Sequence, residues 1–448
     1  MLPQLAPKTH PVDDRPAASR LLVLGFQHVL VMYAGNVAVP LLVAQALKLS
    51  QEQTAFLINA DLFAAGIATL IQTLGIWRFG ARLPVMMGAT FLSVSSMIAM
   101  GLAPAIGLRA FYGGLLVSGF IAILIAPLSG AVLTLFPPVV TGSLITLLGI
   151  SLLAVAVNWA SSGQLSPTGL SLGLSLVVFA IIVLFNKLAS TEWRSLAILI
   201  GILAGALASI PFGLVHFDGI SQGTWVSLIH PLQFGLPTFQ LGAVFSMIVV
   251  MLVTLVESAA VFFALAEITG KPFRQHELVQ ALRADGLGMI FGGLCNAFPY
   301  TTFSQNVGLV SATGVRSRFV CAAGGAILIL LGLLPKLAYL VAAVPQPVLG
   351  GAGLVMFGMV AATGIRILSD VDFHNERNLF IVASSIGLGM IPTLAPHFFA
   401  KLPAWTAPVM NSGVVICTIV GVALNVLLNG REPRVHLVGC LSSYEGGK

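Results

Sequence analysis

The chain has 448 residues, of which 57% are hydrophobic and only 8% are charged, and its mean hydropathy is +1.01. A soluble protein carries roughly 25% charged residues, so this chain has too few polar side chains to cover a surface that faces water. The composition excludes a soluble globular protein and indicates a membrane protein. Because one bilayer-spanning helix takes ~20 apolar residues, the spans leave no room for a large soluble domain.

The net charge of +6 does not require an anionic partner. Helical membrane proteins concentrate Lys and Arg in their cytoplasmic loops, and this rule explains the excess, so no nucleic-acid partner is predicted. The four cysteines show no CxxC spacing, and neither a Walker sequence nor an HExxH motif occurs. We therefore predict no metal site, no cofactor, no catalytic residues and no enzymatic activity.

Residues 1–20 contain charged residues and prolines but no apolar core. They do not have the pattern of a cleavable signal peptide, and we expect a short cytoplasmic tail. Apolar runs separated by charges or by Pro and Gly then predict fourteen membrane segments, seven on each side of a polar stretch near 216–238. The first seven are 20–44, 54–76, 84–101, 110–130, 137–160, 168–187 and 195–215, and the second seven are 239–268, 276–297, 300–315, 317–343, 345–364, 377–398 and 406–429.

An even number of spans places both termini on the same side of the membrane. With fourteen spans, 17 of the Lys and Arg residues fall on the side of the termini and only four on the other side. This asymmetry follows the positive-inside rule. It predicts that both termini are cytoplasmic.

Seven spans per half means that, if the halves are structural repeats, the second is inverted in the membrane relative to the first. In each half the third segment is short and begins with proline, at Pro84 and at Pro299, and these prolines are 215 residues apart. Paired short segments interrupted by Gly or Pro point to a binding site at the bilayer midplane. The alternation of residue types at 300–304 favours short extended stretches, although two short helices kinked by proline remain the alternative.

Glu257 is the clearest ionisable residue inside an apolar run. Intramembrane carboxyl groups are costly and are functional candidates by default. Glu257 would bind and release a proton during transport, or it would remain protonated and bonded to a neighbouring helix. Glu267, ten residues later, is expected at a helix end near the interface.

Three further residues keep two interpretations each. Asp285 is compatible with a helix N-cap or with a group that handles protons or braces a helix. His28 is compatible with a titrating role or with an interhelical hydrogen bond. Asp61 is compatible with a buried brace or with an exposed position at a helix end.

The run QNVGLVSATG, residues 305–314, is the densest polar cluster at membrane depth. The amides of Gln305 and Asn306 offer donors and an acceptor each, which suits the edge of a planar heterocycle. Phe91 and Phe303 are candidates to stack on such a ring, although in a chain with 27 phenylalanines each one is more often a packing residue.

These residues carry a resemblance to a known family. Gln305, Asn306, Gly308, Thr313 and Gly314 match the signature of the nucleobase–ascorbate transporters, also called nucleobase:cation symporter-2 or xanthine/uracil permeases. The first segment, GFQHVLVMYAGNVAVPLLV, resembles the Gln-His opening of that family. The block ADGLGMIFGGLCNAFPYTTFSQNVGLV resembles its ninth and tenth spans. The resemblance covers nearly the whole chain.

The resemblance implies an all-α polytopic fold of fourteen spans in two inverted repeats of seven, with short strands in spans 3 and 10. A core domain would hold the substrate, and a gate domain would form a homodimer against which the core moves as an elevator. The implied boundaries are 1–136 (core, spans 1–4), 137–238 (gate, spans 5–7), 239–343 (core, spans 8–11) and 344–448 (gate, spans 12–14 and the C-terminal tail).

By the same resemblance, several residues at these positions would contact a purine. Glu257 and Gln305 would hydrogen-bond the purine and Phe91 would stack on it. The implied supporting residues are Phe303 and Ser304, which would line the site, Asn306, which would support it, and Asp285 and His28, which would serve proton coupling together with Glu257.

Gln305 places the chain with the purine branch, and Thr90 resembles the members that transport uric acid, as does the spacing of 28 residues between Glu257 and Asp285. By this resemblance uric acid is the expected substrate and xanthine is the second candidate or a co-substrate, and a xanthine-selective or broader nucleobase:cation symporter is the alternative. Proton symport is the expected mode, with sodium as the alternative ion, in a bacterial inner membrane. A passive channel is less favoured, because the polar residues cluster near one depth and do not line a continuous path.

Overall fold

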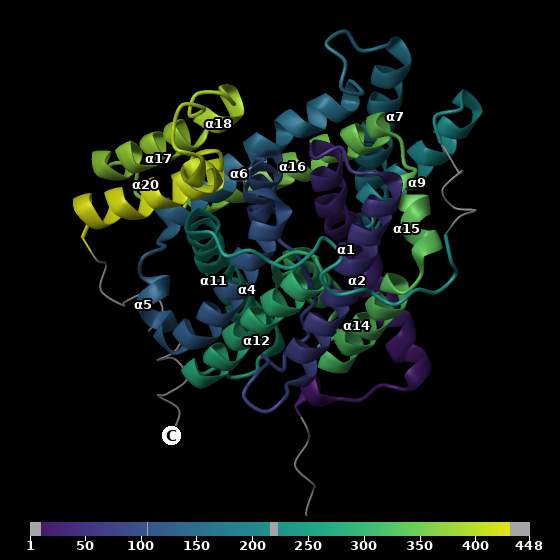
Figure 1. Cartoon of the computed structure of the whole chain (residues 1–448). Helices are drawn as coiled ribbons and strands as arrows, with labels where there is room; N and C mark the ends of the chain where they lie inside the picture. Colours follow the sequence, from purple (N-terminus) through teal and green to yellow (C-terminus); the bar gives the residue numbers. More distant parts are fainter. Residues whose placement is uncertain (1–9, 105, 216–222, 431–448) are drawn as a thin grey trace, which may run out of the picture.

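A computed structural model describes residues 10–104, 106–215 and 223–430, which are mostly helical (Figure 1). Within these ranges eight helical stretches are long and apolar enough to cross a bilayer. They are α1 (Ala18–Ala46), α2 (Gln51–Leu74), α4 (Gly107–Ile125) continued by η3 (Ala126–Leu128) and α5 (Ser129–Leu133), α6 (Pro138–Ala160), α7 (Gly169–Leu188), α11 (Leu241–Thr269), α16 (Gln346–Leu368) and α17 (Glu376–Gly389) with α18 (Ile391–Leu394).

Two bent helix pairs raise this number to ten if each pair is one span. Helix α14 (Arg318–Gly332) meets α15 (Pro335–Ala342) at 81°, and the stretch formed by η5 (Ala404–Thr406) and α19 (Ala407–Met410) meets α20 (Gly413–Leu428) at 74°. Pro335 has no backbone N–H to donate and cannot continue α14, which accounts for the first bend.

The remaining segments are shorter or more charged. They are η1 (Pro11–Asp13), η2 (Phe91–Ser93), α3 (Val94–Leu102), α8 (Thr191–Arg194), α9 (Ala197–Ser209), η4 (Ile210–Phe212), α12 (Gln275–Leu294) and α13 (Ser304–Thr313). Each of the fourteen predicted segments therefore coincides with helical structure. Only eight to ten of those in the described residues qualify as spans by length and composition, so the count of fourteen stays a prediction.

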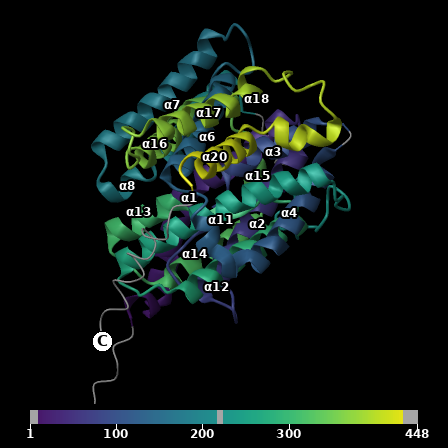
Figure 2. The same ribbon diagram turned by 90° about the vertical axis from the view of Figure 1, so that its left-hand side faces the viewer.

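The helices form two groups, which occupy the upper and lower halves of Figure 2. In one group, α14 and α12 pack on α2, and α4 packs on α11 and α12. In the other, α16 lies along α6 and α7, and α17 packs on α20 and α6. We call the first set, with α1, the α2 group and the second set, with α9, the α16 group.

Close packing within each group depends on glycine. A Cβ added at Gly149 of α6 would lie 2.2 Å from the backbone nitrogen of Ala361 on α16, and a Cβ at Gly66 of α2 would lie 2.6 Å from the carbonyl oxygen of Gly325 on α14. Small residues allow such approaches and are typical of helix contacts in membranes.

Two three-residue strands lie inside the α2 group. Strand β1 (Met87–Ala89) pairs antiparallel with β2 (Tyr300–Thr302), and the register sets Gly88 opposite Thr301. The pairing continues at both ends, because the Phe303 N–H donates to the Met86 carbonyl at 2.9 Å and the Thr90 N–H donates to the Pro299 carbonyl at 3.0 Å. All six strand residues are buried.

Side chains from three helices accept hydrogen bonds from the outer edges of this strand pair. Thr69 Oγ1 of α2 accepts from the Met87 N–H at 2.9 Å, and Asn36 Oδ1 of α1 accepts from the Ala89 N–H at 2.7 Å. The Thr302 N–H donates to Ser258 Oγ of α11 at 3.4 Å. Because unpaired strand edges are not tolerated at membrane depth, these side chains make the short strands possible.

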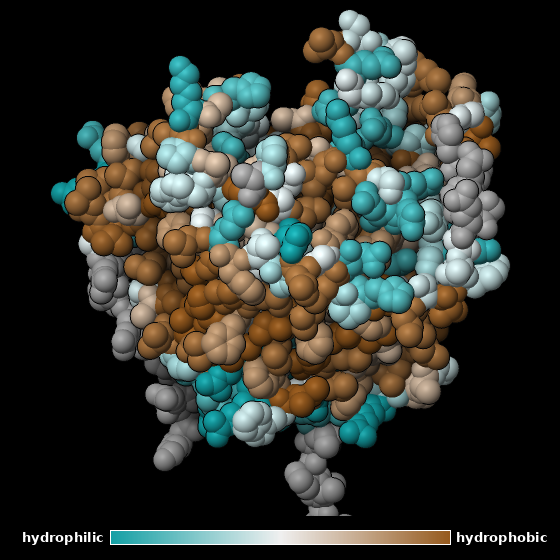
Figure 3. Space-filling view, in the orientation of Figure 1, coloured by the Kyte–Doolittle hydropathy of each residue, from teal (hydrophilic) through white to brown (hydrophobic). Residues whose placement is uncertain are grey.

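The surface has the character of a membrane protein. Figure 3 shows a wide hydrophobic belt across the lower half of one face, with hydrophilic residues gathered below it and above it. On α7 the side chains of Leu176, Leu184 and Leu188 are 65%, 56% and 72% exposed. Such a large apolar exposure is stable only against lipid or another protein.

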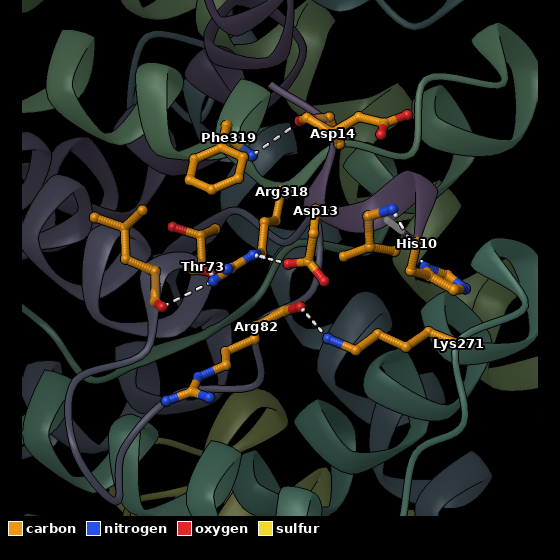
Figure 4. Close-up of polar contacts among 11 residues, drawn as sticks. His10, Asp13, Asp14, Thr73, Arg82, Lys271, Arg318 and Phe319 are labelled. Carbon is orange, nitrogen blue, oxygen red and sulfur yellow. Dashed lines mark hydrogen bonds and ion pairs between the residues drawn. The ribbon is translucent and has the colours of Figure 1, made fainter. Parts of the chain in front are cut away.

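The segment before α1 is hydrogen-bonded to residues at helix ends of the α2 group (Figure 4). Arg318 Nε donates to the Asp13 carboxylate at 2.7 Å, and one terminal nitrogen of Arg318 donates to the carbonyls of Thr73 and Leu74 at the end of α2, at 3.0 and 2.8 Å. Ser317 Oγ donates to the Asp14 carbonyl at 2.6 Å. Arg318 therefore satisfies carbonyls that the end of a helix leaves unpaired.

We expect Arg318→Ala to lower the free energy of unfolding by about 1–3 kcal/mol, because two α2 carbonyls lose a charged donor. Asp13→Ala should cost less than about 1 kcal/mol, because ion pairs at exposed positions contribute little, and the Asp13 side chain is 39% exposed. Thermal unfolding of the purified protein in detergent measures both changes. Equal losses in the two variants would contradict the assignment of Arg318 to the end of α2.

Candidate functional site

Glu257 lies in the middle of α11, partly buried, beside β2. Thr301 Oγ1 of β2 donates to Glu257 Oε2 at 3.4 Å, and Thr301 Oγ1 is also 3.2 Å from the hydroxyl of Ser258. Two adjacent residues of α11 thus have different roles. Ser258 supports the backbone of β2, and Glu257 places a carboxyl group next to it.

A short helix begins where each strand ends. Strand β1 is followed by η2 and α3, and β2 is followed by α13. The side chains of Ser304 and Gln305, in the first turn of α13, are exposed. Because the first N–H groups of a helix have no partner within it, this turn offers backbone donors together with the Gln305 amide.

Thr90 and Phe91 lie at the matching position after β1. Thr90 is buried, and its hydroxyl accepts from the Leu92 N–H at 3.2 Å while its carbonyl accepts from Ser93 Oγ at 3.1 Å. The partly buried Phe91 ring meets Phe357 of α16 edge to face, with 5.8 Å between centroids. Phe91 therefore lies where the α2 group meets the α16 group.

Phe303 is a packing residue in this structure. Its side chain is only 6% exposed, and its ring covers Gly35 of α1 and Gly88 of β1, where an added Cβ would lie 3.1 and 2.5 Å from ring carbons. The ring occupies the space that these glycines leave, so only the backbone of Phe303 borders the turn that holds Ser304 and Gln305.

Asn306 and His28 form one buried contact between α13 and α1. The Asn306 amide nitrogen donates to the His28 carbonyl at 2.9 Å and lies 3.1 Å from His28 Nδ1. Because that amide nitrogen can only donate, Nδ1 is the acceptor, and a neutral imidazole then carries its proton on Nε2. The structure thus gives His28 the interhelical hydrogen bond that the sequence left as one of two interpretations.

Asp285 is not a helix N-cap, because α12 begins ten residues before it, at Gln275. Its carboxyl group is buried, and Gln72 Nε2 of α2 donates to Oδ1 at 2.6 Å. The same amide donates to the Ala281 carbonyl and accepts from the Ala81 N–H. Within the described residues, Asp285 Oδ2 has no hydrogen-bond partner.

Asp61 is a second buried carboxyl group. Asp61 of α2 accepts from Asn36 and from Tyr300, and the sequence had left its position undecided. Neither Gln72 nor Asn36 was selected from the sequence. The only signal for Asn36 was its position after Gly35 inside an otherwise apolar run.

The polar site is separate from an apolar cavity of about 310 Å³. The cavity lies between α1, α6, α9, α15 and α16, and its lining includes Val37, Trp159 and Met356 but neither Glu257 nor Gln305. It offers almost no polar partner to a heterocycle. In the described ranges, no group of three or more His, Cys, Asp or Glu residues could hold a metal ion.

Solved structures resemble the fold. The transmembrane domain of a cyanobacterium bicarbonate transporter, BicA, gives a TM-score of 0.59 at 16% identity and covers 92% of this chain and 99% of that one. The murine Slc26a9 anion transporter in the inward-facing state gives 0.60 at 13% identity, over 96% of this chain and 70% of that one. At these identities the likeness concerns the fold alone.

Curated relatives match over almost the full length. The uric acid transporter UacT of Escherichia coli (strain K12) is 47% identical over 96% of this chain and 90% of its own. The xanthine permease of Bacillus subtilis (strain 168) is 43% identical over 93% and 95%, and the uric acid permease PucK of the same organism is 43% identical over 94% and 99%. A model of the permease family matches residues 19–398. The chain therefore belongs to this permease family, the nucleobase–ascorbate transporters, and is a transporter and not an enzyme.

Proposed function

We propose that this permease imports uric acid by proton symport, with xanthine as the second candidate or a co-substrate. Relatives named as uric acid or xanthine transporters, at 40–47% identity, support a purine substrate. The observation that carries the proposal is the position of Glu257 beside β2, next to the exposed first turn of α13 with Ser304 and Gln305.

These groups fit the chemistry of a purine edge. Urate and xanthine are planar and carry N–H donors and carbonyl acceptors along their rims. Glu257 supplies an acceptor, Gln305 supplies a donor and an acceptor, and the Phe91 ring supplies a face for stacking. One purine N–H or carbonyl left unpaired in the site would cost ~1–3 kcal/mol, which is enough to separate related purines.

Proton coupling is proposed for the same site. A carboxyl group that binds a proton and a purine at stages of one cycle links the two affinities reciprocally, and Glu257 is placed to do so. Asp285 and His28 would serve this coupling through Gln72 and Asn306, to which they are hydrogen-bonded or in contact. Sodium is the alternative coupling ion.

For the mechanism we propose an elevator. The α2 group would be the core domain, and the α16 group the gate domain, with the boundaries 1–136, 137–238, 239–343 and 344–448. Packing of α14 and α12 on α2, and of α16 on α6 and α7, supports the division. Fourteen spans in two inverted repeats, a homodimer through the gate domain and a bacterial inner membrane with both termini cytoplasmic complete the proposal.

A passive purine channel is the competing function. It would need a polar path through the molecule, whereas Glu257, Gln305 and the strand ends form one cluster and the cavity at the boundary of the two groups is apolar. A channel cannot accumulate its substrate against a gradient, so accumulation separates the two functions.

Uptake of radiolabelled uric acid tests the proposal in cells without purine permeases of their own. We expect accumulation that a protonophore abolishes, and a loss of roughly 10-fold or more in Glu257→Gln, because a charged acceptor is removed. Glu267→Gln is the matched control, since Glu267 is an exposed residue near the end of the same helix. Accumulation that resists the protonophore would refute proton coupling, and equal effects of the two variants would refute the role of Glu257.

Selectivity is tested at Thr90. The Thr90 hydroxyl is engaged by the Leu92 N–H, whereas an asparagine would bring both a donor and an acceptor. We expect Thr90→Asn to shift the ratio of uric acid to xanthine uptake toward xanthine by about 5-fold or more. Thr90→Ser, which keeps the hydroxyl, should leave the ratio unchanged, and competition uptake with both labelled purines measures it. An unchanged ratio in Thr90→Asn would remove Thr90 from the specificity determinants.

A further inference from the structure

A buried hydrogen-bond network next to the strand pair joins Asn36, Asp61 and Tyr300. Asn36 Nδ2 donates to Asp61 Oδ2 at 2.5 Å, and the Tyr300 hydroxyl lies 3.2 Å from Asp61 Oδ1 and 3.0 Å from the Asp61 carbonyl. All three side chains have no solvent exposure. They come from α1, α2 and β2, and the mechanism proposed above uses none of them.

This hydrogen-bond network contacts both strands at one position of their register. Asn36 Oδ1 accepts from the Ala89 N–H of β1 at 2.7 Å, so the amide has one orientation, with its nitrogen toward Asp61. Ala89 is the partner of Tyr300 across the strand pair. The carboxyl group of Asp61 therefore holds β1 through Asn36 and β2 through Tyr300.

Asp61 differs from Asp285 although the two have the same place in their helices. Asp61 lies ten residues after the first residue of α2, and Asp285 lies ten residues after the first residue of α12. Each is buried and each is bonded to a residue of the other half of the chain. Both carboxyl oxygens of Asp61 are hydrogen-bonded, whereas Asp285 bonds Gln72 through Oδ1 and has the Ser258 hydroxyl near its carboxyl group.

We propose that Asp61 is a positioning residue of the transport site, and this inference rests on the proposed function. Thr90 and Phe91 follow β1 directly, and Phe303 through Gln305 follow β2. Thr301, next to Tyr300, carries the contact to Glu257. By fixing the register and depth of both strands, Asp61 sets the distance between the groups that contact the purine, and it takes no part in carrying the proton.

Exchange of the two residues tests this contact. Asn36→Asp places a second carboxylate against Asp61 and removes a donor, so we expect the KM for uric acid to rise roughly 10-fold or more. In the double variant Asn36→Asp/Asp61→Asn, the amide at position 61 donates to the carboxylate at 36, whose other oxygen accepts from Ala89. The double variant should return to within about 3-fold of the wild-type KM, the sign of direct coupling.

Tyr300→Phe tests the hydrogen bond between Asp61 and β2. It removes only a hydroxyl group, and we expect a rise of about 5-fold in KM with little change in the maximal rate. Tyr112→Phe is the matched control, because the buried Tyr112 hydroxyl donates to the Asn296 carbonyl, in the loop before β2, and not to Asp61. In Tyr300→Phe the ratio of uptake at acidic pH to uptake at neutral pH should equal that of the wild type. A changed ratio would mean that the hydrogen-bond network takes part in proton coupling.

A measurement without substrate separates this inference from the proposed function. Hydrogen exchange of the purified protein reports the Met87 and Ala89 amides directly, and we expect at least about 10-fold faster exchange in Asp61→Ala than in the wild type. If the wild type transports no purine but exchange responds in this way, the substrate proposal fails and the positioning of the strands stands. If the double variant is no better than Asn36→Asp, or exchange is unchanged in Asp61→Ala, the positioning role is wrong.

Discussion

The structure depends on satisfying the backbone of two short strands inside a membrane. An unpaired N–H or carbonyl group at that depth costs several kcal/mol, and in the part of the chain that the structure describes β1 and β2 have only each other as strand partners. Thr69, Asn36 and Ser258 accept from the outer N–H groups. Because these acceptors come from α2, α1 and α11, the strands tie those helices into one unit.

The same solution creates the candidate site. A strand that ends inside the membrane must be followed by a helix, which pairs its own backbone. The two helices that follow the strands carry Phe91 and Gln305 in their first turns. Ser258 supports β2, and the adjacent Glu257 faces Thr301. A side chain that pairs the strand backbone is thus adjacent in the sequence to a side chain of the candidate site.

Part of the boundary between the two helix groups is apolar. Phe91 meets Phe357 there, and the cavity near Trp159 and Met356 is lined by apolar side chains. Hydrogen bonds also cross this boundary, because Ser246 Oγ of α11 donates to the Pro408 carbonyl at 2.9 Å and Ser412 Oγ, before α20, lies 3.0 Å from Ser96 Oγ of α3. Within the α2 group, Asp61 and Asp285 make directional bonds between helices, and Asn306 of α13 donates to the His28 carbonyl of α1.

The sequence by itself determined that the chain belongs in a membrane, where its apolar segments lie, and that Pro84 and Pro299 mark two interrupted segments, because composition and local pattern carry this information. The signature around Gln305 also identified the family, which the comparisons confirm. The sequence did not decide the roles of Asp285, His28, Asp61 or Phe303. Their partners are distant in the chain: Gln72 is 213 residues from Asp285, and Tyr300 is 239 residues from Asp61. Only tertiary packing brings such groups together, since a buried carboxyl group takes its function from the donors that the fold places around it.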